Sequence, residues 1–296
     1  MCDFTQYGNL CEEWLRVQDT TVPTSGKEDV LMLKKLGNES RVALATKEMS
    51  VLAPMIKMQN YSISMRDGSL IQGRSYRPVE VADRVPLYIH FHGGGFLVGT
   101  LDSEDSICSR IALETGVAVL NINYRHTPEH TYPTAWHDTQ DAFLWVHLHA
   151  KELNVDPSRV VVGGISAGAW LAASLTLEQH LRNNIKPCPK IAGQILMIPA
   201  LVHMDCYAPQ MDQMASFEVS SYKQNENAPI LPVKRSRLFT DLLHVTNPQI
   251  NDTLLNPGNV DLISARGLPA TVLGIAGADP LRDEGLLYAK KLSEAG

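Results

Sequence analysis

The fold of this chain is decided by the stretch Val160-Val161-Val162-Gly163-Gly164-Ile165-Ser166-Ala167-Gly168-Ala169-Trp170-Leu171. Its valine-rich start predicts a buried strand, and the alanine-rich residues at its end predict a helix. Between them, Gly164 to Gly168 has the form G-x-S-x-G, in which a serine occupies a tight strand-to-helix turn and glycines relieve crowding around it. Ser166 is therefore a candidate nucleophile, and a glycine-rich turn with an incidental serine is the alternative.

The same alternation of short apolar runs and helical patterns continues on both sides of this stretch. The predicted strands are residues 87–91, 117–124, 160–165, 195–199 and 271–274, and the predicted helices are residues 103–114, 135–153, 167–183 and 281–295. Strands rich in Val, Ile and Leu, with little polar alternation, are typical of parallel sheets that are covered on both faces. We therefore predict an α/β fold with a doubly wound, mostly parallel sheet.

Two regions fall outside this alternation. Residues 1–60 indicate amphipathic helix and loop, and residues 203–256 form an irregular insertion between two predicted core strands. An insertion that leaves the carboxyl end of a strand lies beside the crevice where such sheets bind ligands. We expect an N-terminal cap segment at 1–60 and a core at 61–296 that carries a cap insertion at about 203–256. Five of the insertion's side chains are candidates either for lining an apolar pocket or for packing a peripheral helix: Met204, Met211, Met214, Phe217 and Tyr222.

Composition excludes several classes of protein. The 296 residues carry a net charge of −6 and offer no basic patch for a phosphate backbone, so we expect no nucleic-acid partner. The longest apolar stretch, residues 191–202, is shorter than the roughly 20 residues of a membrane span, and the N-terminus has no secretory pattern. The cysteines are scattered and predict neither metal nor cofactor, only reduced thiols in the cytoplasm or another intracellular compartment: Cys2, Cys11, Cys108, Cys188 and Cys206.

A glycine-rich loop follows the first predicted strand. His92 precedes three successive glycines, whose backbone N–H groups are free to point into a cavity and to form an oxyanion hole. A phosphate-binding loop is the competing interpretation, although no Lys-Ser/Thr pair follows the glycines. His92 suits a structural hydrogen bond better than the role of general base, because its loop precedes the nucleophile.

An acidic residue follows the last predicted strand. Asp279 lies after the carboxyl end of strand 271–274, where the acid of a Ser-Asp-His triad is found in chain order. A helix N-cap ahead of Pro280 is the alternative role, and the two roles are difficult to serve at once. Asp283 and Glu284 are expected to be first-turn residues that the helix dipole favours.

Four motifs together resemble the hormone-sensitive-lipase family of carboxylesterases. They are His92 to Gly95, Asn123 to His130, Gly164 to Gly168, and Asp279 to Gly285, within about residues 60 to 296. The resemblance implies an α/β-hydrolase fold with a helical cap. It also implies a triad in which Ser166 attacks an acyl carbonyl and Asp279 orients a histidine. The oxyanion hole would comprise the loop Gly93 to Gly95 and Ala167, the residue after the nucleophile, with the backbone N–H groups of Gly94, Gly95 and Ala167 as donors. The implied partner is a small-molecule ester, without cofactor or metal.

The sequence departs from this family at the base. The family's catalytic histidine follows one further strand, whereas none of the ten histidines here comes after Asp279, so the last strand and helix are expected to be absent. His126 is not expected to replace the base. A serine hydrolase for small or medium acyl esters is the leading hypothesis, with thioesterase or acyltransferase as mechanistic variants.

Two other hypotheses follow from the absence of the base. One is a non-catalytic small-molecule-binding protein, because plant gibberellin receptors resemble this family without the histidine. The other is a truncated product of a longer gene, which would also have lost any C-terminal peroxisomal address. If the chain is an enzyme, we expect it to catalyse a tailoring step in secondary metabolism. A second copy of the chain, in a homodimer, is also compatible with the sequence.

Overall fold

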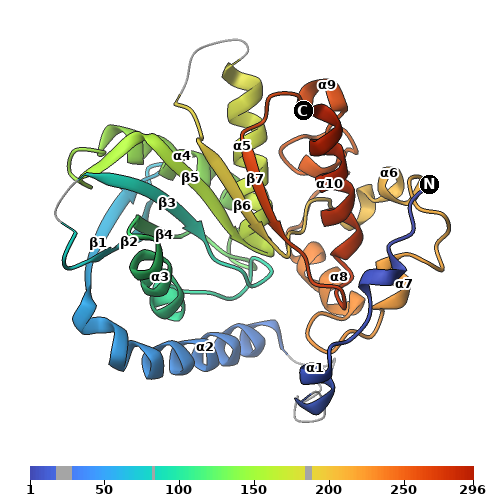
Figure 1. Ribbon diagram of the computed structural model, residues 1–296, viewed down its shortest axis with the longest axis horizontal. Helices are drawn as coiled ribbons and strands as arrows, with labels where there is room; N and C mark the ends of the chain where they lie inside the picture. The colour runs from blue at the N-terminus through green and yellow to red at the C-terminus, as the bar shows by residue number, and fades with distance from the viewer. Residues whose placement is uncertain (18–28, 82–83, 184–188) are drawn as a thin grey trace.

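Seven strands form one sheet, in the order β1-β2-β4-β3-β5-β6-β7 (Figure 1). The computed structural model describes residues 1–17, 29–81, 84–183 and 189–296, and the strand count refers to these residues. The strands are β1 (Ile56–Ser64), β2 (Leu70–Pro78), β3 (Val85–Phe91), β4 (Ala118–Asn123), β5 (Val155–Ile165), β6 (Gly193–Met197) and β7 (Ala270–Gly274). β1 and β2 are antiparallel at one edge, and the pairs from β4 to β7 are parallel. The predicted doubly wound, mostly parallel sheet is confirmed.

The β1–β2 hairpin has no counterpart among the predicted strands. Its residues are largely exposed on one face, so the hairpin lacks the continuous apolar run that indicates a buried parallel strand. A tight turn closes it, in which the backbone N–H of Met65 donates to the carbonyl of Ser69 at 2.9 Å and Gly68 has a φ of +82°. Because β1 begins at Ile56, the last residues of the range 1–60 belong to the sheet.

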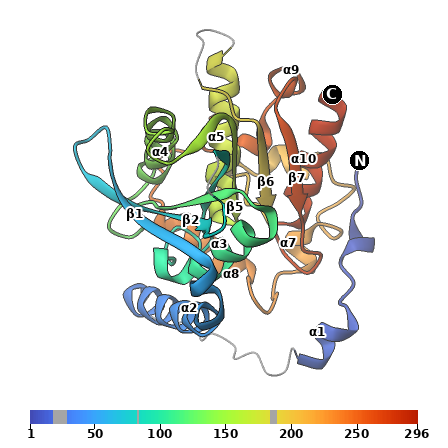
Figure 2. The same ribbon diagram turned by 60° about the vertical axis from the view of Figure 1, so that its left-hand side comes forward.

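Helices cover both faces of the sheet, as Figure 2 shows. The longer ones are α2 (Val30–Leu52), α3 (Leu101–Thr115), α4 (Thr134–Leu148), α5 (Ala167–Asn183) and α10 (Arg282–Ala295). Neighbouring residues of a strand point to opposite faces, so Tyr88 belongs to one buried cluster with Cys108 of α3, while Ile89 belongs to another with Leu171 of α5. α4 ends before the predicted residue 153, because a turn at residues 149–154 leads into β5. No helix in the described ranges has the length and apolarity needed to cross a bilayer.

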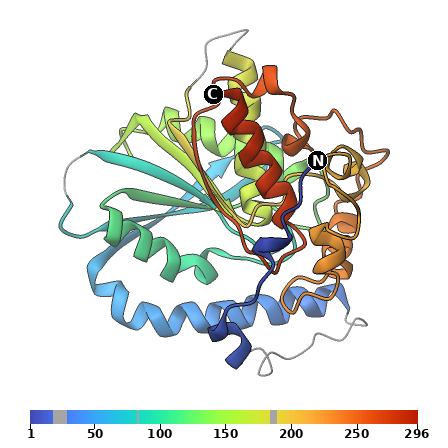
Figure 3. The same cartoon turned by 45° about the vertical axis from the view of Figure 1, so that its right-hand side comes forward.

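The N-terminal segment and the insertion after β6 lie side by side, at the lower right of Figure 1 and again in Figure 3. The segment carries α1 (Glu12–Val17), and the chain between β6 and β7 carries α6 (Ala208–Met211), α7 (Ser221–Gln224), α8 (Val233–Leu242) and α9 (Leu262–Ala265). Cys2 joins the two regions, because its backbone N–H donates to the carbonyl of Gln213 at 2.6 Å and its carbonyl accepts from Ala215 at 2.8 Å.

Candidate active site

Ser166 lies on the turn between β5 and α5. Its φ is +54°, a conformation that non-glycine residues seldom adopt, and its backbone N–H donates to the carbonyl of Met197 at 2.8 Å. A Cβ on Gly164 would lie 2.2 Å from the carbonyl oxygen of Phe91, and one on Gly168 would lie 1.9 Å from the same atom. Both glycines are therefore required by the close approach of β3, which explains the G-x-S-x-G spacing.

The three glycines after β3 line a cavity beside Ser166. Gly94 and Gly95 have φ values of +129° and +63°, so the loop bends in a way that side chains would oppose. Within residues 1–17, 29–81, 84–183 and 189–296, no acceptor is recorded for the backbone N–H groups of Gly94, Gly95 and Ala167. These residues line the cavities at the serine, and free N–H groups there suit the binding of a negatively charged oxygen.

Gly93 contributes its carbonyl to a buried polar network. Arg41, from α2, donates through Nη1 to the Gly93 carbonyl at 2.9 Å and through Nη2 to Glu104 Oε1 at 2.7 Å. The other oxygen of Glu104 lies 3.1 Å from His90 Nε2. Burial raises the pKa of Glu104, but the hydrogen bond from His90 and the charges nearby outweigh it and lower the pKa to about 2. The sequence did not predict this support, because Arg41 is 52 positions from Gly93 and neither Arg41 nor Glu104 belongs to a local motif.

His92 is fully buried and lines neither cavity at Ser166. Its Nδ1 lies 3.0 Å from the carbonyl of Gly93, its Nε2 lies 3.2 Å from Nε2 of His126, and its ring stacks on Tyr124. Burial lowers the pKa of His92 to about 4, so the ring is neutral at physiological pH. These contacts support a hydrogen-bonding role for His92 in the loop.

Asp279 lies between β7 and α10 and lines the same cavity as Ser166. Its Oδ1 accepts the backbone N–H of Leu281 at 2.8 Å, which fixes the turn that leads into α10. In the described parts of the chain no partner is recorded for Oδ2. α10 begins at Arg282 with Leu281 as its N-cap and has no side-chain cap bond among the described residues, so Asp279 forms a turn ahead of the helix and is not its N-cap. Burial raises the pKa of this carboxyl group.

Asp283 and Glu284 do more than lie in the first turn of a helix, because they also bind backbone outside α10. Asp283 and Glu284 lie in the first turn of α10, but both are buried. Asp283 pairs with buried Arg282 at 2.9 Å and accepts the backbone N–H of Ser221 at 2.6 Å, while Glu284 accepts that of Leu201 at 3.0 Å. These bonds connect α10 to the insertion.

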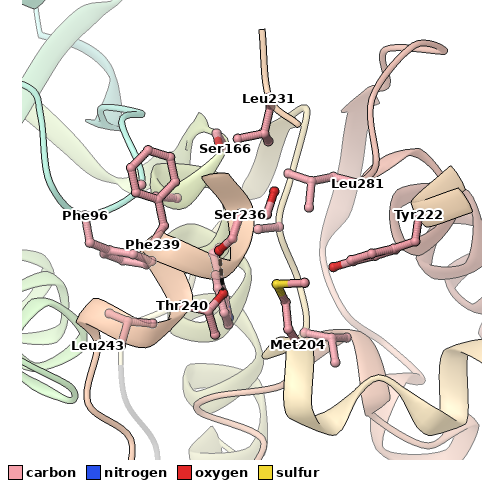
Figure 4. Close-up of a pocket in the computed structure, with 15 residues that line it drawn as sticks. Phe96, Ser166, Met204, Tyr222, Leu231, Ser236, Phe239, Thr240, Leu243 and Leu281 are labelled. Carbon is pink, nitrogen blue, oxygen red and sulfur yellow. Dashed lines mark hydrogen bonds between the residues drawn. The ribbon is translucent and has the colours of Figure 1, made fainter. Parts of the chain in front are cut away.

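Two cavities meet at Ser166. The smaller has a volume of about 40 Å³ and is lined by Ser236, Phe239 and Thr240 of α8 (Figure 4). The larger has a volume of about 720 Å³ and is also lined by Trp14 of α1. Of the insertion's five candidate side chains, Met204 and Tyr222 line the smaller cavity, and Met211, Met214 and Phe217 line neither. Their spacing in the sequence could not distinguish the two groups, because the insertion's short helices have no steady periodicity.

All ten histidines lie in the described residues, and none lines either cavity.

Comparisons with known proteins agree with this geometry. Residues 88–296 match a family model described as the alpha/beta hydrolase fold. A carboxylesterase of Mycobacterium tuberculosis, NlhH, is 32% identical over 249 residues, which cover 83% of this chain and 72% of that protein. An ethyl acetate hydrolase of Pseudomonas putida is 30% identical over 81% of this chain and 70% of its own length. The esterase of Pyrobaculum calidifontis superposes with a TM-score of 0.81 at 27% identity, over 97% of this chain and 86% of that chain.

Proposed function

The chain belongs to the hormone-sensitive-lipase-like α/β-hydrolase carboxylesterases, and from this premise we propose that it cleaves esters of small or medium acyl groups through an acyl intermediate on Ser166. The observation that carries the proposal is the position of Ser166, which lines one cavity with Asp279 and shares its cavities with Gly94, Gly95 and Ala167, whose backbone N–H groups have no acceptor among the described residues. The glycine loop, the nucleophile and the acid follow one another in the chain order of α/β-hydrolases.

In the proposed reaction, Ser166 Oγ attacks the acyl carbonyl carbon and its proton passes to a general base. The carbonyl oxygen becomes negatively charged and is held by the N–H groups of Gly94, Gly95 and Ala167, each of which is worth about 2.7–4 kcal/mol in comparable sites. The C–O bond to the alcohol then breaks, and the base returns the proton to the leaving oxygen. Water repeats the sequence on the acyl-serine and releases the acid.

The general base would act in the larger cavity, which both Ser166 and Asp279 line. Since none of the chain's histidines lines that cavity, added imidazole can test whether a base bound there activates Ser166. Oδ2 of Asp279 is available to orient such a ring, as the acid of a triad does.

The test is acylation of Ser166 by p-nitrophenyl acetate, followed by mass spectrometry and by p-nitrophenol release, with and without imidazole. We expect an acyl adduct on Ser166 and a release rate that rises with imidazole to saturation. The variant Ser166→Ala should lose both and keep only the linear reaction of free imidazole. Equal behaviour of the two proteins would overturn the proposal, and transfer to an added thiol or alcohol would favour the acyltransferase variant.

A second candidate is a non-catalytic binding protein, favoured by the absence of a histidine from both cavities. It predicts saturable binding of a small apolar acid with no Ser166 adduct under any of these conditions. The adduct therefore decides between the two functions.

We also propose that residues 1–60 and about 203–256 act as caps over the site. The supporting observation is that Leu10 and Trp14 from the first region, and Leu231 and Phe239 from the second, line the larger cavity. Such a covered site suits a small metabolite better than a lipid interface, which supports our prediction of a tailoring step in secondary metabolism.

A further inference from the structure

Phe239 divides the space at Ser166 into two compartments. The ring lies against Gly95, because a Cβ built on that glycine would be 2.3 Å from two ring carbons. Gly95, Ser166, Leu231 and Phe239 line both cavities, so the serine has access to each side of this partition.

The two compartments suit different halves of an ester. Asp279 lines only the larger cavity, and the base that it would orient must also reach the oxygen of the leaving alcohol. The alcohol half therefore belongs in the larger cavity. The acyl half belongs in the smaller one, whose wall includes Ala167 and Trp170. This assignment rests on the proposed function.

The smaller cavity limits the length of the acyl chain. Its volume of about 40 Å³ is small beside the 720 Å³ of the larger cavity. Much of its wall is apolar, with Phe96, Trp170 and Met204 among the side chains. A short acyl group therefore belongs in this cavity.

Two hydroxyl groups interrupt this apolar wall. Ser236 is 7% exposed, and its Oγ has no hydrogen-bond partner among the described residues. Tyr222 is half-buried and lines the same cavity, and its hydroxyl points toward Met204 in Figure 4. Thr240 differs, because its Oγ1 donates to the carbonyl of Ser236 at 2.9 Å. Burial keeps the pKa of Tyr222 well above its usual value, so its hydroxyl remains a donor at neutral pH. A buried hydroxyl without a partner is costly, and a ligand oxygen would remove that cost.

We propose that the smaller cavity binds a short acyl group with an oxygen substituent, a hydroxyacyl or oxoacyl group, and that Ser236 and Tyr222 form hydrogen bonds with that oxygen. The substrate class is then an ester of a short hydroxy or oxo acid with a bulkier alcohol. Water in the cavity is the competing occupant, and it would give no preference for such an acid.

The test uses the acids that hydrolysis would release, so it does not depend on turnover. Binding of butyrate, 3-hydroxybutyrate and acetoacetate to the full chain is measured by isothermal titration calorimetry. We expect the oxygenated acids to bind about threefold to tenfold more tightly than butyrate, as one or two net hydrogen bonds allow. Ser236→Ala and Tyr222→Phe, each of which removes a single oxygen atom, should reduce that ratio while the affinity for butyrate is kept.

Equal affinity of the three acids would overturn the inference and indicate water in the cavity. A preference that survives in both variants would also overturn it, because another group would then be responsible. The result is separate from the proposed function. A preference for the oxygenated acids without a Ser166 adduct would support the pocket assignment and contradict the esterase function. An adduct without that preference would support the esterase function and contradict the pocket assignment.

Discussion

The turn around Ser166 and the insertion between β6 and β7 meet at the same cavities, yet they are held in opposite ways. At the turn, backbone contacts backbone, since Gly164 and Gly168 both press on the carbonyl of Phe91. In the insertion, side chains contact distant backbone, as where Gln210 Nε2 donates to the carbonyl of Gly258 at 3.2 Å. The turn requires glycines at a fixed spacing, whereas the insertion can keep its shape with many different side chains. The chemistry is therefore placed by the turn, and the shape of the pocket by the insertion.

Gly168→Ala should give the largest loss of stability. Its new Cβ would lie 1.9 Å from the carbonyl oxygen of Phe91, so one of the two backbones would have to shift. We expect the free energy of unfolding to fall by about 3 kcal/mol or more, measured by urea denaturation. Gly116→Ala is the matched control, because Gly116 has a φ of +72° but open space around it. The control should lose only about 1–2 kcal/mol, and an equal loss in both would show that the turn is not especially crowded.

Arg41→Met should give the next largest effect, on the rate of Ser166 acylation. Arg41 holds the carbonyl of Gly93, and in a planar peptide this also sets the direction of the Gly94 N–H. Loss of one oxyanion donor costs about 100-fold or more, so a misdirected donor should cost about tenfold to 100-fold. Arg41→Lys should be intermediate, and added guanidinium ion should partly restore Arg41→Met. Slower acylation without any rescue would point to a general loss of structure.

Much of the fold was predictable from the sequence, whereas the pocket was not. The parallel strands are apolar runs, and the glycines of the turn have a spacing that backbone contacts impose. The contact of Arg41 with Gly93 spans 52 positions and leaves no local pattern. In the insertion, Met204 reaches the cavity while Phe217 is 55% exposed, although both are apolar residues of one irregular segment. Tertiary contacts alone decide between them.

Glu284→Gln tests the junction between α10 and the insertion through pH. Burial raises the pKa of Glu284 well above its usual value, so the native state keeps a proton that the unfolded chain loses. The carboxyl group therefore stabilises the fold fully below its unfolded pKa, and this contribution is lost as pH rises through the folded pKa. Glutamine does not titrate and retains an oxygen for the N–H of Leu201. Relative to the parent, the variant should gain at least about 1 kcal/mol between acidic and mildly alkaline pH in urea unfolding. Glu218→Gln, exposed in the insertion, is the matched control. If Glu284→Gln gains no stability relative to the parent, the carboxylate of Glu284 is in contact with water in the native state.

Arg237→Gln should give the smallest effect. Arg237 lies in α8 and pairs with Asp205 at 2.7 Å and Asp241 at 3.6 Å, and their carboxylate side chains are 49% and 62% exposed. Exposed ion pairs are worth about 0.2–1 kcal/mol, so we expect urea denaturation to show a loss within that range. The difference between parent and variant should shrink further in about 1 M salt, where charges are screened beyond about 3 Å. A larger or salt-independent loss would show that the insertion depends on a specific charge network. The insertion would then require particular residues, as the turn around Ser166 does, and the two regions would differ only in the kind of contact that holds them.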